Sequence, residues 1–202
     1  MKRFALSIAV ILSAITAVSG EELLFRGHSF ATSIDAFRAA EGAEVELFTY
    51  DPAHDPIDVG LWYEDKQVAG YGANFEAGFK ADVLTGGIYE IHIDDDLNPS
   101  QEVVFSVSVY RDLQHRLTQL YGTPFLRDSM NQLTHPVPFS ERAEIERVAE
   151  YITRWDYGGG RISLQLEYQN WYWELILIYM SPEWLQRTRA RQEERATSTG
   201  GL

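Results

Sequence analysis

The sequence predicts an α+β fold: an antiparallel sheet built from two helix-plus-meander repeats, with the helices on one face. Three observations lead to this prediction. Two segments have apolar residues at helical spacing, and they end at Gly42 and Gly122. Each is followed by short alternating runs separated by glycine or acidic turns, which is typical of antiparallel strands. The hairpin at 161–180 has the strongest strand pattern in the chain.

Residues 1–20 have the pattern of a secretory signal peptide. Lys2 and Arg3 form a basic start, an apolar run covers 4–18, and small residues precede Glu21. A run of about 15 apolar residues is short for a hydrocarbon core of ~30 Å, so a membrane anchor is the weaker interpretation. We therefore expect cleavage near Gly20, a periplasmic or secreted location, and no stable membrane insertion after cleavage.

The composition excludes some classes of partner. The chain has 17 Lys and Arg against 30 Asp and Glu, a formal net charge of −13. Binding to DNA or RNA requires basic residues that neutralise phosphates, so we expect no nucleic-acid partner. The sequence contains no Cys, so disulfides cannot contribute and a hydrophobic core must supply the stability.

The first half begins with a short helix. Thr32 or Ser33 can cap it, and Gly42 suits its end. A strand is expected at 44–50, followed by a loop at 51–56, because the Asp-Pro steps disfavour helix. Further strands are expected at 59–64, 67–71, 75–83 and 88–93, with turns at Asp65-Lys66 and Gly86-Gly87.

The second half begins with a long helix from Ser100 to about Tyr121, stopped by Gly122 and Pro124. The β-branched run 103–107 leaves a strand as the alternative at its start. A loop at 123–138, a short charged helix or turn at 140–149 and a strand at 150–156 follow. The glycines at 158–160 then turn the chain into the closing hairpin.

These elements define the expected domain organisation. Residues 21–184 are predicted to form one domain with two halves, about 21–96 and 97–184. Residues 185–202 are charged or small and polar, and we expect a disordered tail, although the charged run 187–195 is compatible with a helix.

Short motifs along the chain resemble a group of exported bacterial proteins of unassigned function. The group has a Phe-x-Gly helix start, a Val-Ala-Gly-Tyr strand, a helix that ends in Tyr-Gly-x-Pro, a Trp-led strand pair and a closing Ser-Pro-Glu. The matching stretches here are Phe25–Ser33, Val68–Tyr71, Leu113–Pro124, Trp155–Leu166 and Ile178–Glu183. The order of elements also resembles the α/β-repeat topology of the β-lactamase-inhibitor protein and of the small outer-membrane assembly lipoproteins. That similarity concerns topology and implies no activity.

The closing hairpin carries the main functional question. In its first arm, Ile162, Leu164 and Leu166 alternate with polar residues, as in a strand with one buried face. The second arm, 171–180, is apolar on both faces except at Glu174. Either both faces are packed, or one is an exposed platform for a protein, peptide or glycan partner. In the second case the candidate binding residues are Trp171, Tyr172 and Trp173.

His92, Asp94 and Asp96 are the densest candidate for chemistry. On a strand they would share a face, and an imidazole with two carboxylates can ligate a divalent cation. The alternative is a strand that leaves the sheet through an acidic turn. A calcium-loop pattern fails because Pro99 and Phe105 occupy its glycine and glutamate positions.

Two other acidic groups have weaker support. Asp51, His54, Asp55 and Asp58 lie in a loop that two prolines already explain. Glu64 or Asp65 with Glu90 could form an acid–base pair, although the sequence gives no separation between them. The chain also lacks the Gly-x-Ser-x-Gly motif of serine hydrolases.

From these patterns we predict an exported, non-enzymatic binding or protein-interaction module without a metal or cofactor. Its contact surface would be the sheet face that carries Tyr172 or Trp173, and its partner a protein or peptide of the cell envelope. The alternative is a metal-dependent or acid/base hydrolase that uses His92, Asp94 and Asp96.

Overall fold

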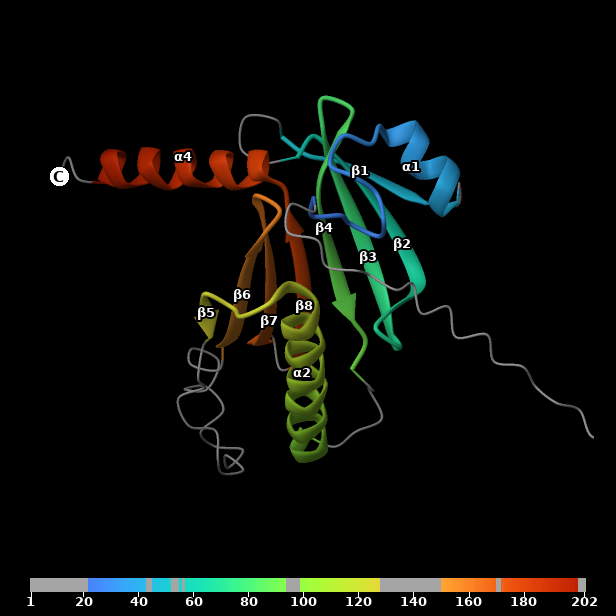
Figure 1. The fold of residues 1–202 in the computed structure, drawn as a ribbon, viewed down its shortest axis with the longest axis vertical. Coiled ribbons are helices and arrows are strands. Elements are labelled where there is room, and N and C mark those ends of the chain that lie inside the picture. The colour runs from blue at the N-terminus through green and yellow to red at the C-terminus, as the bar shows by residue number, and fades with distance from the viewer. Residues whose placement is uncertain are drawn as a thin grey trace, which may run out of the picture.

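A computed structural model describes residues 22–42, 45–51, 55, 57–93, 99–127, 150–169 and 172–199. Within these residues the fold is α+β, as predicted, and one antiparallel sheet has the strand order β1-β2-β3-β4-β8-β7-β6-β5 (Figure 1). The strands are β1 (Glu46–Thr49), β2 (Val59–Val68), β3 (Tyr71–Lys80), β4 (Val83–Ile91), β5 (Leu126–Arg127), β6 (Glu150–Tyr157), β7 (Gly160–Gln169) and β8 (Tyr172–Met180). The helices are α1 (Ile34–Glu41), α2 (Pro99–Tyr121) and α4 (Pro182–Thr199).

Helix α1 begins and ends as its sequence predicts. The Ser33 hydroxyl accepts a hydrogen bond from the Ala36 N–H at 3.3 Å, so Ser33 is the N-cap. At the other end Gly42 has φ +114°, a conformation that glycine adopts without strain. The cap and the terminating glycine were both readable from the sequence.

Helix α2 is continuous through 103–107, so the helix prediction is confirmed over the strand alternative. Val109, Tyr110, Leu113 and Leu117 are buried, and α2 lies along β6, β7 and β8 (Figure 1). Packing of this apolar stripe outweighs the weak β preference of the valines at its start. Gly122, with φ +82°, follows the helix.

Two predicted turns in the first half are wrong. Asp65-Lys66 forms a bulge inside β2, where Asp65 has φ +52°, and the chain turns at Ala69-Gly70 instead. Gly86-Gly87 lies within β4, and the preceding turn is Ala81-Asp82. The error arose because glycine and acidic residues mark bulges as well as turns.

The two glycines in β4 are explained by rings that cross the strand. A Cβ added to Gly86 would lie 2.2 Å from the Trp184 ring, and one added to Gly87 would lie 2.2 Å from the Phe25 ring. The two rings press on opposite faces of the sheet. Any larger residue at either position would displace one of them.

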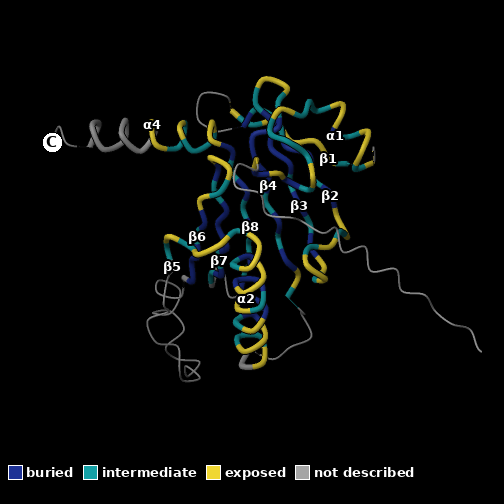
Figure 2. Tube along the Cα trace, in the orientation of Figure 1, coloured by how far each residue is buried: buried dark blue, intermediate teal, exposed yellow. Residues whose placement is uncertain are grey.

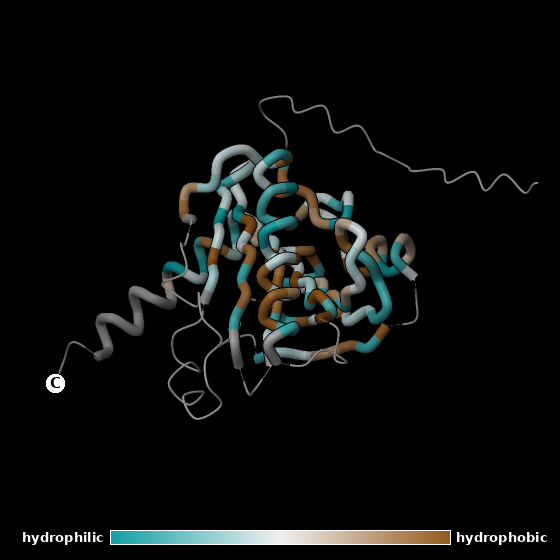
Figure 3. Tube along the Cα trace, turned by 90° about the horizontal axis from the view of Figure 1, so that it is seen from below, coloured by the Kyte–Doolittle hydropathy of each residue, from teal (hydrophilic) through white to brown (hydrophobic). Residues whose placement is uncertain are grey.

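The main core lies on one face of the sheet, which we call the core face. The register places Leu61, Phe75, Tyr89, Leu164 and Leu177 on it, each no more than 5% exposed. Phe37 of α1 packs edge-on against Phe75 and Phe79 there. Tyr110 of α2 contacts the Tyr151 ring and hydrogen-bonds Thr153 on the same face. Buried stretches concentrate along the strands (Figure 2), and apolar stretches follow the strands and α2 (Figure 3).

The closing hairpin is confirmed, whereas the C-terminal segment differs from its prediction. β7 and β8 pair from Arg161↔Met180 to Gln169↔Tyr172. Residues 185–199 belong to α4, so the helix that the charged run 187–195 allowed forms where we expected a disordered tail. The Ser181 hydroxyl caps this helix by accepting from the Trp184 N–H at 3.1 Å, and Trp184 docks it on Gly86. A capped first turn with a docked tryptophan lets a strongly polar segment continue as helix.

Among the helices that the structure describes, none has the length and hydrophobicity to cross a bilayer. The helix or turn predicted at 140–149, most of the loop predicted at 123–138 and the proposed signal peptide lie outside the described residues.

Candidate functional site

The face of the sheet opposite the core face carries an unusual mixture of isoleucines and glutamates. We call it the outer face. The register aligns Trp62, Glu76, Ile88 and Ile178 across β2, β3, β4 and β8. The next row contains Glu90, Ile176 and Gln165, and the row after it pairs Glu174 with Glu167. Each of these side chains is half-buried and keeps part of its surface in solvent.

One end of the outer face is covered by other parts of the chain. Gly60, Gly78 and Gly86 form a row across β2, β3 and β4. Ile57 lies over Gly78, and Trp184 lies over Gly86. Covering this end buries the apolar groups there and leaves the isoleucine and glutamate rows facing solvent.

Glu76 is held in place by the glycine row and by a tyrosine. Its carboxylate lies over Gly60, where a Cβ would come within 1.9 Å of Oε1. The Tyr50 hydroxyl donates a hydrogen bond of 2.7 Å to the same oxygen. Burial raises the pKa of Glu76, and the hydrogen bond from Tyr50 opposes that shift.

Glu90 and Glu174 are less well satisfied. Within the part of the chain that the structure describes, neither carboxylate has a hydrogen bond or an ion pair. Burial raises the pKa of Glu90, and so do Glu174 and Glu76, whereas His92 lowers it. The pKa of Glu174 is raised by burial and by Glu167, its direct partner across the strands. Like charges placed in this way repel and lack compensation.

The two arginines on the outer face lie on β6 and β7, away from Glu90 on β4. Arg161 forms an ion pair with Asp156, its neighbour across β6 and β7, at 2.8 Å. Arg154 Nε lies 3.5 Å from the Ser163 hydroxyl. Over β4 and β8, the carboxylates without a hydrogen bond or ion pair among the described residues are those of Glu90 and Glu174.

A pocket of about 600 Å³ lies at the β1–β2 end of the sheet. It is lined by Val45, Glu46, Trp62, Glu64 and Lys66, with Glu41 and Gly42 behind them. The pocket exists because β1 pairs with β2 only from Val59 to Trp62, while β2 continues to Val68. Trp62 joins this pocket to the outer face.

The structure distributes the predicted aromatic residues differently from our expectation. Trp173 points to the core face with Leu175 and Leu177 and is 5% exposed, and its main-chain N–H donates to Glu102 of α2 at 3.1 Å. Its ring belongs to the core and is not available as a contact surface, because helix packing decides which face of an apolar strand is covered. Tyr172 pairs with Gln169 at the start of β8. Its side chain, and Trp171 as a whole, lie outside the described residues.

The candidate metal cluster of the alternative hypothesis is only partly described. His92 follows β4, is exposed, and its N–H donates to the Gly72 carbonyl at 2.9 Å. Asp94 and Asp96 lie outside the described residues. Among the residues that are described, no three His, Asp or Glu side chains are grouped so that they could hold a metal ion.

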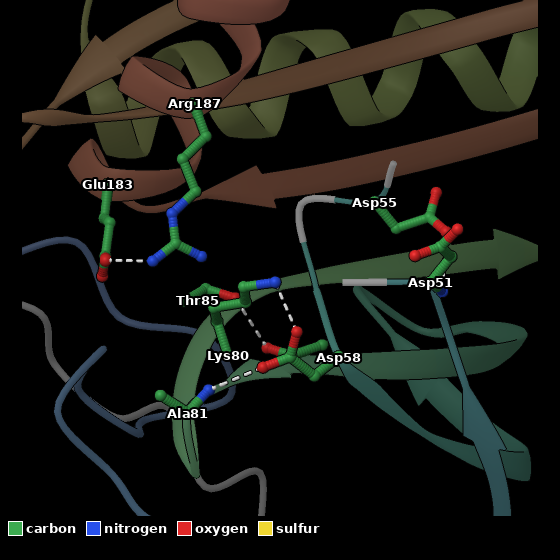
Figure 4. Close-up of polar contacts among 9 residues, drawn as sticks. Asp51, Asp55, Asp58, Lys80, Ala81, Thr85, Glu183 and Arg187 are labelled. Carbon is green, nitrogen blue, oxygen red and sulfur yellow. Dashed lines mark hydrogen bonds and ion pairs between the residues drawn. The ribbon is translucent and has the colours of Figure 1, made fainter. Parts of the chain in front are cut away.

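The second acidic cluster organises a loop (Figure 4). Asp58 accepts a hydrogen bond from the Lys80 ammonium and another of 3.0 Å from the Ala81 N–H. These hydrogen bonds lower the pKa of Asp58. The Asp55 carboxylate accepts from the Asp51 N–H at 3.1 Å. Both aspartates hold backbone turns, and His54 lies outside the described residues.

The candidate acid–base pair is not brought together. Glu64 and Asp65 are exposed beside the β2 bulge, and β3 separates them from Glu90. The Asp65 N–H instead donates to the Asn74 side chain at 3.3 Å.

The sequence analysis did not identify a charged group beside α1. The Glu41 carboxylate binds Arg26 at 2.9 Å and His28 Nε2 at 3.1 Å. Arg26 has φ +53° in a tight turn and lies 4.4 Å from the centre of the Phe75 ring. The group ties the turn at 25–28 to the end of α1, which accounts for its residues without a ligand. Only the spacing of Phe25, Gly27 and Ser33 hinted at this turn.

The glutamates of the outer face were also missed as a group. Glu76, Glu90 and Glu174 are far apart in the sequence, and each is a single acidic residue among many. The available signal was local: each one replaces an apolar or small residue at an outer-face position of a central strand. Only the register between strands brings them together.

Comparison of the chain with protein-family models, curated proteins and solved structures gives no match.

Proposed function

We propose that this protein is an exported, non-enzymatic binding module whose contact surface is the outer face of the sheet. Its partner is a protein or peptide of the cell envelope. One observation carries the proposal: Glu90 and Glu174 lie half-buried among isoleucines on the outer face, without a hydrogen bond or an ion pair among the described residues. A protein keeps such a destabilising arrangement where a function needs it.

The shape and composition of the surface favour recognition of a macromolecule. Trp62, Ile88, Ile176 and Ile178 offer apolar area on adjacent strands, with partial exposure. Tryptophan and desolvated charges are the groups that contribute most at protein interfaces. The pocket beside Trp62 adds a recess at one end where a partner side chain can insert.

This proposal keeps the strand named by the sequence analysis and changes the residues. β8 does present apolar side chains on two faces, but its odd-numbered residues pack in the core. The contact residues are then the even-numbered Glu174, Ile176 and Ile178. Tyr172 has the same parity and remains a candidate.

We also infer that the fold consists of two halves with the same plan, 21–96 and 97–184. Two features support this division. The sheet order runs from β1 to β4 and then from β8 to β5, so the halves meet where β4 pairs with β8. Phe37 of α1 and Tyr110 of α2 both contact residues of the core face. With α1 and α2 packed on the core face, the part of the outer face that Trp184 of α4 does not cover would be available for a partner.

Site-specific cross-linking tests the proposed function. A photo-activated residue replaces Ile88 on the outer face, and in a second variant it replaces Leu120, which is exposed on α2. The chain is expressed with its own residues 1–20, and the exported fraction is irradiated and analysed by mass spectrometry. We expect a protein or peptide adduct from position 88 and none from position 120.

The control separates binding from chance collision, because both positions are apolar and accessible to solvent. Equal adducts at both positions, or none at position 88 in folded exported protein, would contradict the proposed surface. Retention of the chain in the cytoplasm would contradict export.

A further inference from the structure

We infer that the outer face binds a cationic segment, an extended stretch of a partner protein in which Lys or Arg side chains alternate with apolar ones. This inference rests on the proposed function and specifies the chemistry of the partner. The occupant is chosen by charge complementarity: Glu90 and Glu174 have no hydrogen bond or ion pair among the described residues, and Arg161 on the same face is paired with Asp156.

The placement of the glutamates suits a cation between strands. Glu90 on β4 pairs with Ile176, two residues from Glu174 on β8. Residues related in this diagonal way are about 7–8 Å apart, within reach of long side chains. An ammonium or guanidinium group between them would contact both carboxylates. It would replace repulsion by two charge-assisted hydrogen bonds in a partly desolvated place.

A second cation has a separate place at Glu76. This carboxylate lies one row from Glu90, on the neighbouring strand β3. Its Oε1 accepts from Tyr50, and Oε2 can receive a donor from a partner. The two places alternate with apolar side chains, Ile88 beside Glu76 and Ile176 beside Glu90. A partner that alternates charged and apolar side chains matches both kinds of contact.

Two other charged groups lie near the glutamates. His92 lowers the pKa of Glu90, so its charge would compete with a partner cation at that carboxylate. Glu167 faces Glu174 and adds negative charge. An acidic partner would have to approach all four carboxylates, so the face disfavours it.

The experiment measures binding of model peptides to the full exported chain by titration calorimetry. The probes are short capped peptides of alternating Lys and Val, of alternating Glu and Val, and of alternating Lys and Ser. We expect binding of the Lys-Val peptide alone. The Glu-Val peptide tests the charge, and the Lys-Ser peptide tests the apolar contribution.

Two double variants decide where the peptide binds. E90Q/E174Q removes two charges from the outer face, and E22Q/D82N removes two exposed charges elsewhere. Asn is suitable at position 82 because it tolerates the φ of +65° found there. Each lost charge-assisted contact reduces affinity about tenfold, so E90Q/E174Q should bind the Lys-Val peptide at least tenfold more weakly. E22Q/D82N should match the parent chain.

A second readout distinguishes specific contacts from general attraction to an acidic protein. Because the bound cation stabilises the ionised carboxylates, whose pKa values are raised in the free protein, binding at mildly acidic pH should release protons. The release appears as a dependence of the binding heat on the ionisation enthalpy of the buffer. It should disappear in E90Q/E174Q and persist in E22Q/D82N.

The outcomes separate this inference from the proposed function. Equal affinity of the two double variants, or equal binding of the Glu-Val peptide, overturns the cationic partner, while cross-linking at position 88 would still stand. A dimer in sedimentation that E90Q/E174Q abolishes would also overturn it and give the face to a second copy. Helix α4, with four arginines against three glutamates, would be the basic element in that case.

Discussion

At the scale of single residues, the protein treats its acidic side chains in two ways. Each carboxylate oxygen of Asp58 accepts a hydrogen bond, one from the Lys80 ammonium and one from the Ala81 N–H, and these bonds lower the pKa of Asp58. Glu90 and Glu174 have no such partners among the described residues, and their pKa values are raised. Glu76 lies between these cases, since burial raises its pKa while Tyr50 supplies one donor. The first kind stabilises a turn, and the second keeps charge available on a surface.

The Tyr50 hydroxyl should therefore contribute more to the free energy of unfolding than the hydroxyl of an ordinary surface tyrosine. Tyr50→Phe removes the donor to Glu76 and leaves a half-buried carboxylate without compensation. We expect the free energy of unfolding to fall by about 1–2 kcal/mol at pH 7. Near pH 4 the loss should be smaller, because a protonated Glu76 needs the donor less. Urea denaturation at the two pH values measures both.

Tyr71→Phe is the matched control. The Tyr71 hydroxyl donates to Asp112 at 2.8 Å, but Asp112 also has Arg116 at 2.7 Å and is more exposed. Its loss should change stability by no more than about 0.5 kcal/mol. Equal losses in the two variants would show that Glu76 does not depend on Tyr50.

At the scale of elements, two glycines of this sheet make room for aromatic rings that pack over a strand, and they do not form a turn. Gly86 and Gly87 lie within β4 because Trp184 and Phe25 cross the strand on opposite faces. The sequence patterns gave the helices, the hairpin and the strand periodicity. They did not give these crossings, because the crossing rings come from segments distant in sequence. The same limit explains α4, which Trp184 docks on the sheet although its own pattern is polar.

Gly86→Ala should destabilise the protein through the Trp184 ring. The added methyl would lie 2.2 Å from that ring and 2.8 Å from the Tyr179 carbonyl. Overpacking of this kind costs about 1–3 kcal/mol. In a double-mutant cycle, Gly86→Ala should lower the free energy of unfolding less in the Trp184→Ala background than in the parent chain. The ring is absent there, and only the contact with the Tyr179 carbonyl remains. Full additivity in thermal or urea unfolding would contradict the crossing.

At the scale of the whole molecule, charge and architecture support one another. The chain has a net charge of −13, and part of that charge is concentrated on the outer face. Phe37 of α1, Tyr110 of α2 and most of the buried aromatic side chains pack on the core face, whereas Trp184 of α4 covers one end of the outer face. A sheet with one such covered face can keep uncompensated charge on the other and remain folded.

The stability of the molecule should depend on pH in a direction set by the outer face. A carboxyl whose pKa is higher in the folded state binds its proton more tightly there. Its contribution to stability is present below the ordinary glutamate pKa, and it is lost as the pH rises through the raised value. Glutamine does not ionise, so the E90Q/E174Q variant does not lose stability in this way as the pH rises. We therefore expect its free energy of unfolding at pH 7 to exceed that of the parent chain by about 1 kcal/mol.

The difference in free energy of unfolding between E90Q/E174Q and the parent chain should shrink towards zero near pH 4, where Glu90 and Glu174 are protonated. Urea denaturation across this range, with E22Q/D82N beside it, measures the effect. A variant that is less stable than the parent at pH 7 would show that the two glutamates serve the fold. A more stable variant that binds the cationic peptide poorly would show that they serve binding.

The sequence by itself determined the α+β class, the caps of α1, the extent of α2 and the closing hairpin, because each depends on residues that are neighbours along the chain. Only the tertiary structure decided which face of β8 is covered, where the glycines of β4 lie, and that Glu76, Glu90 and Glu174 share one surface. Those features depend on the register between strands and on what packs over them. Side chains from separate strands meet only when the sheet forms, so no local pattern can specify that meeting.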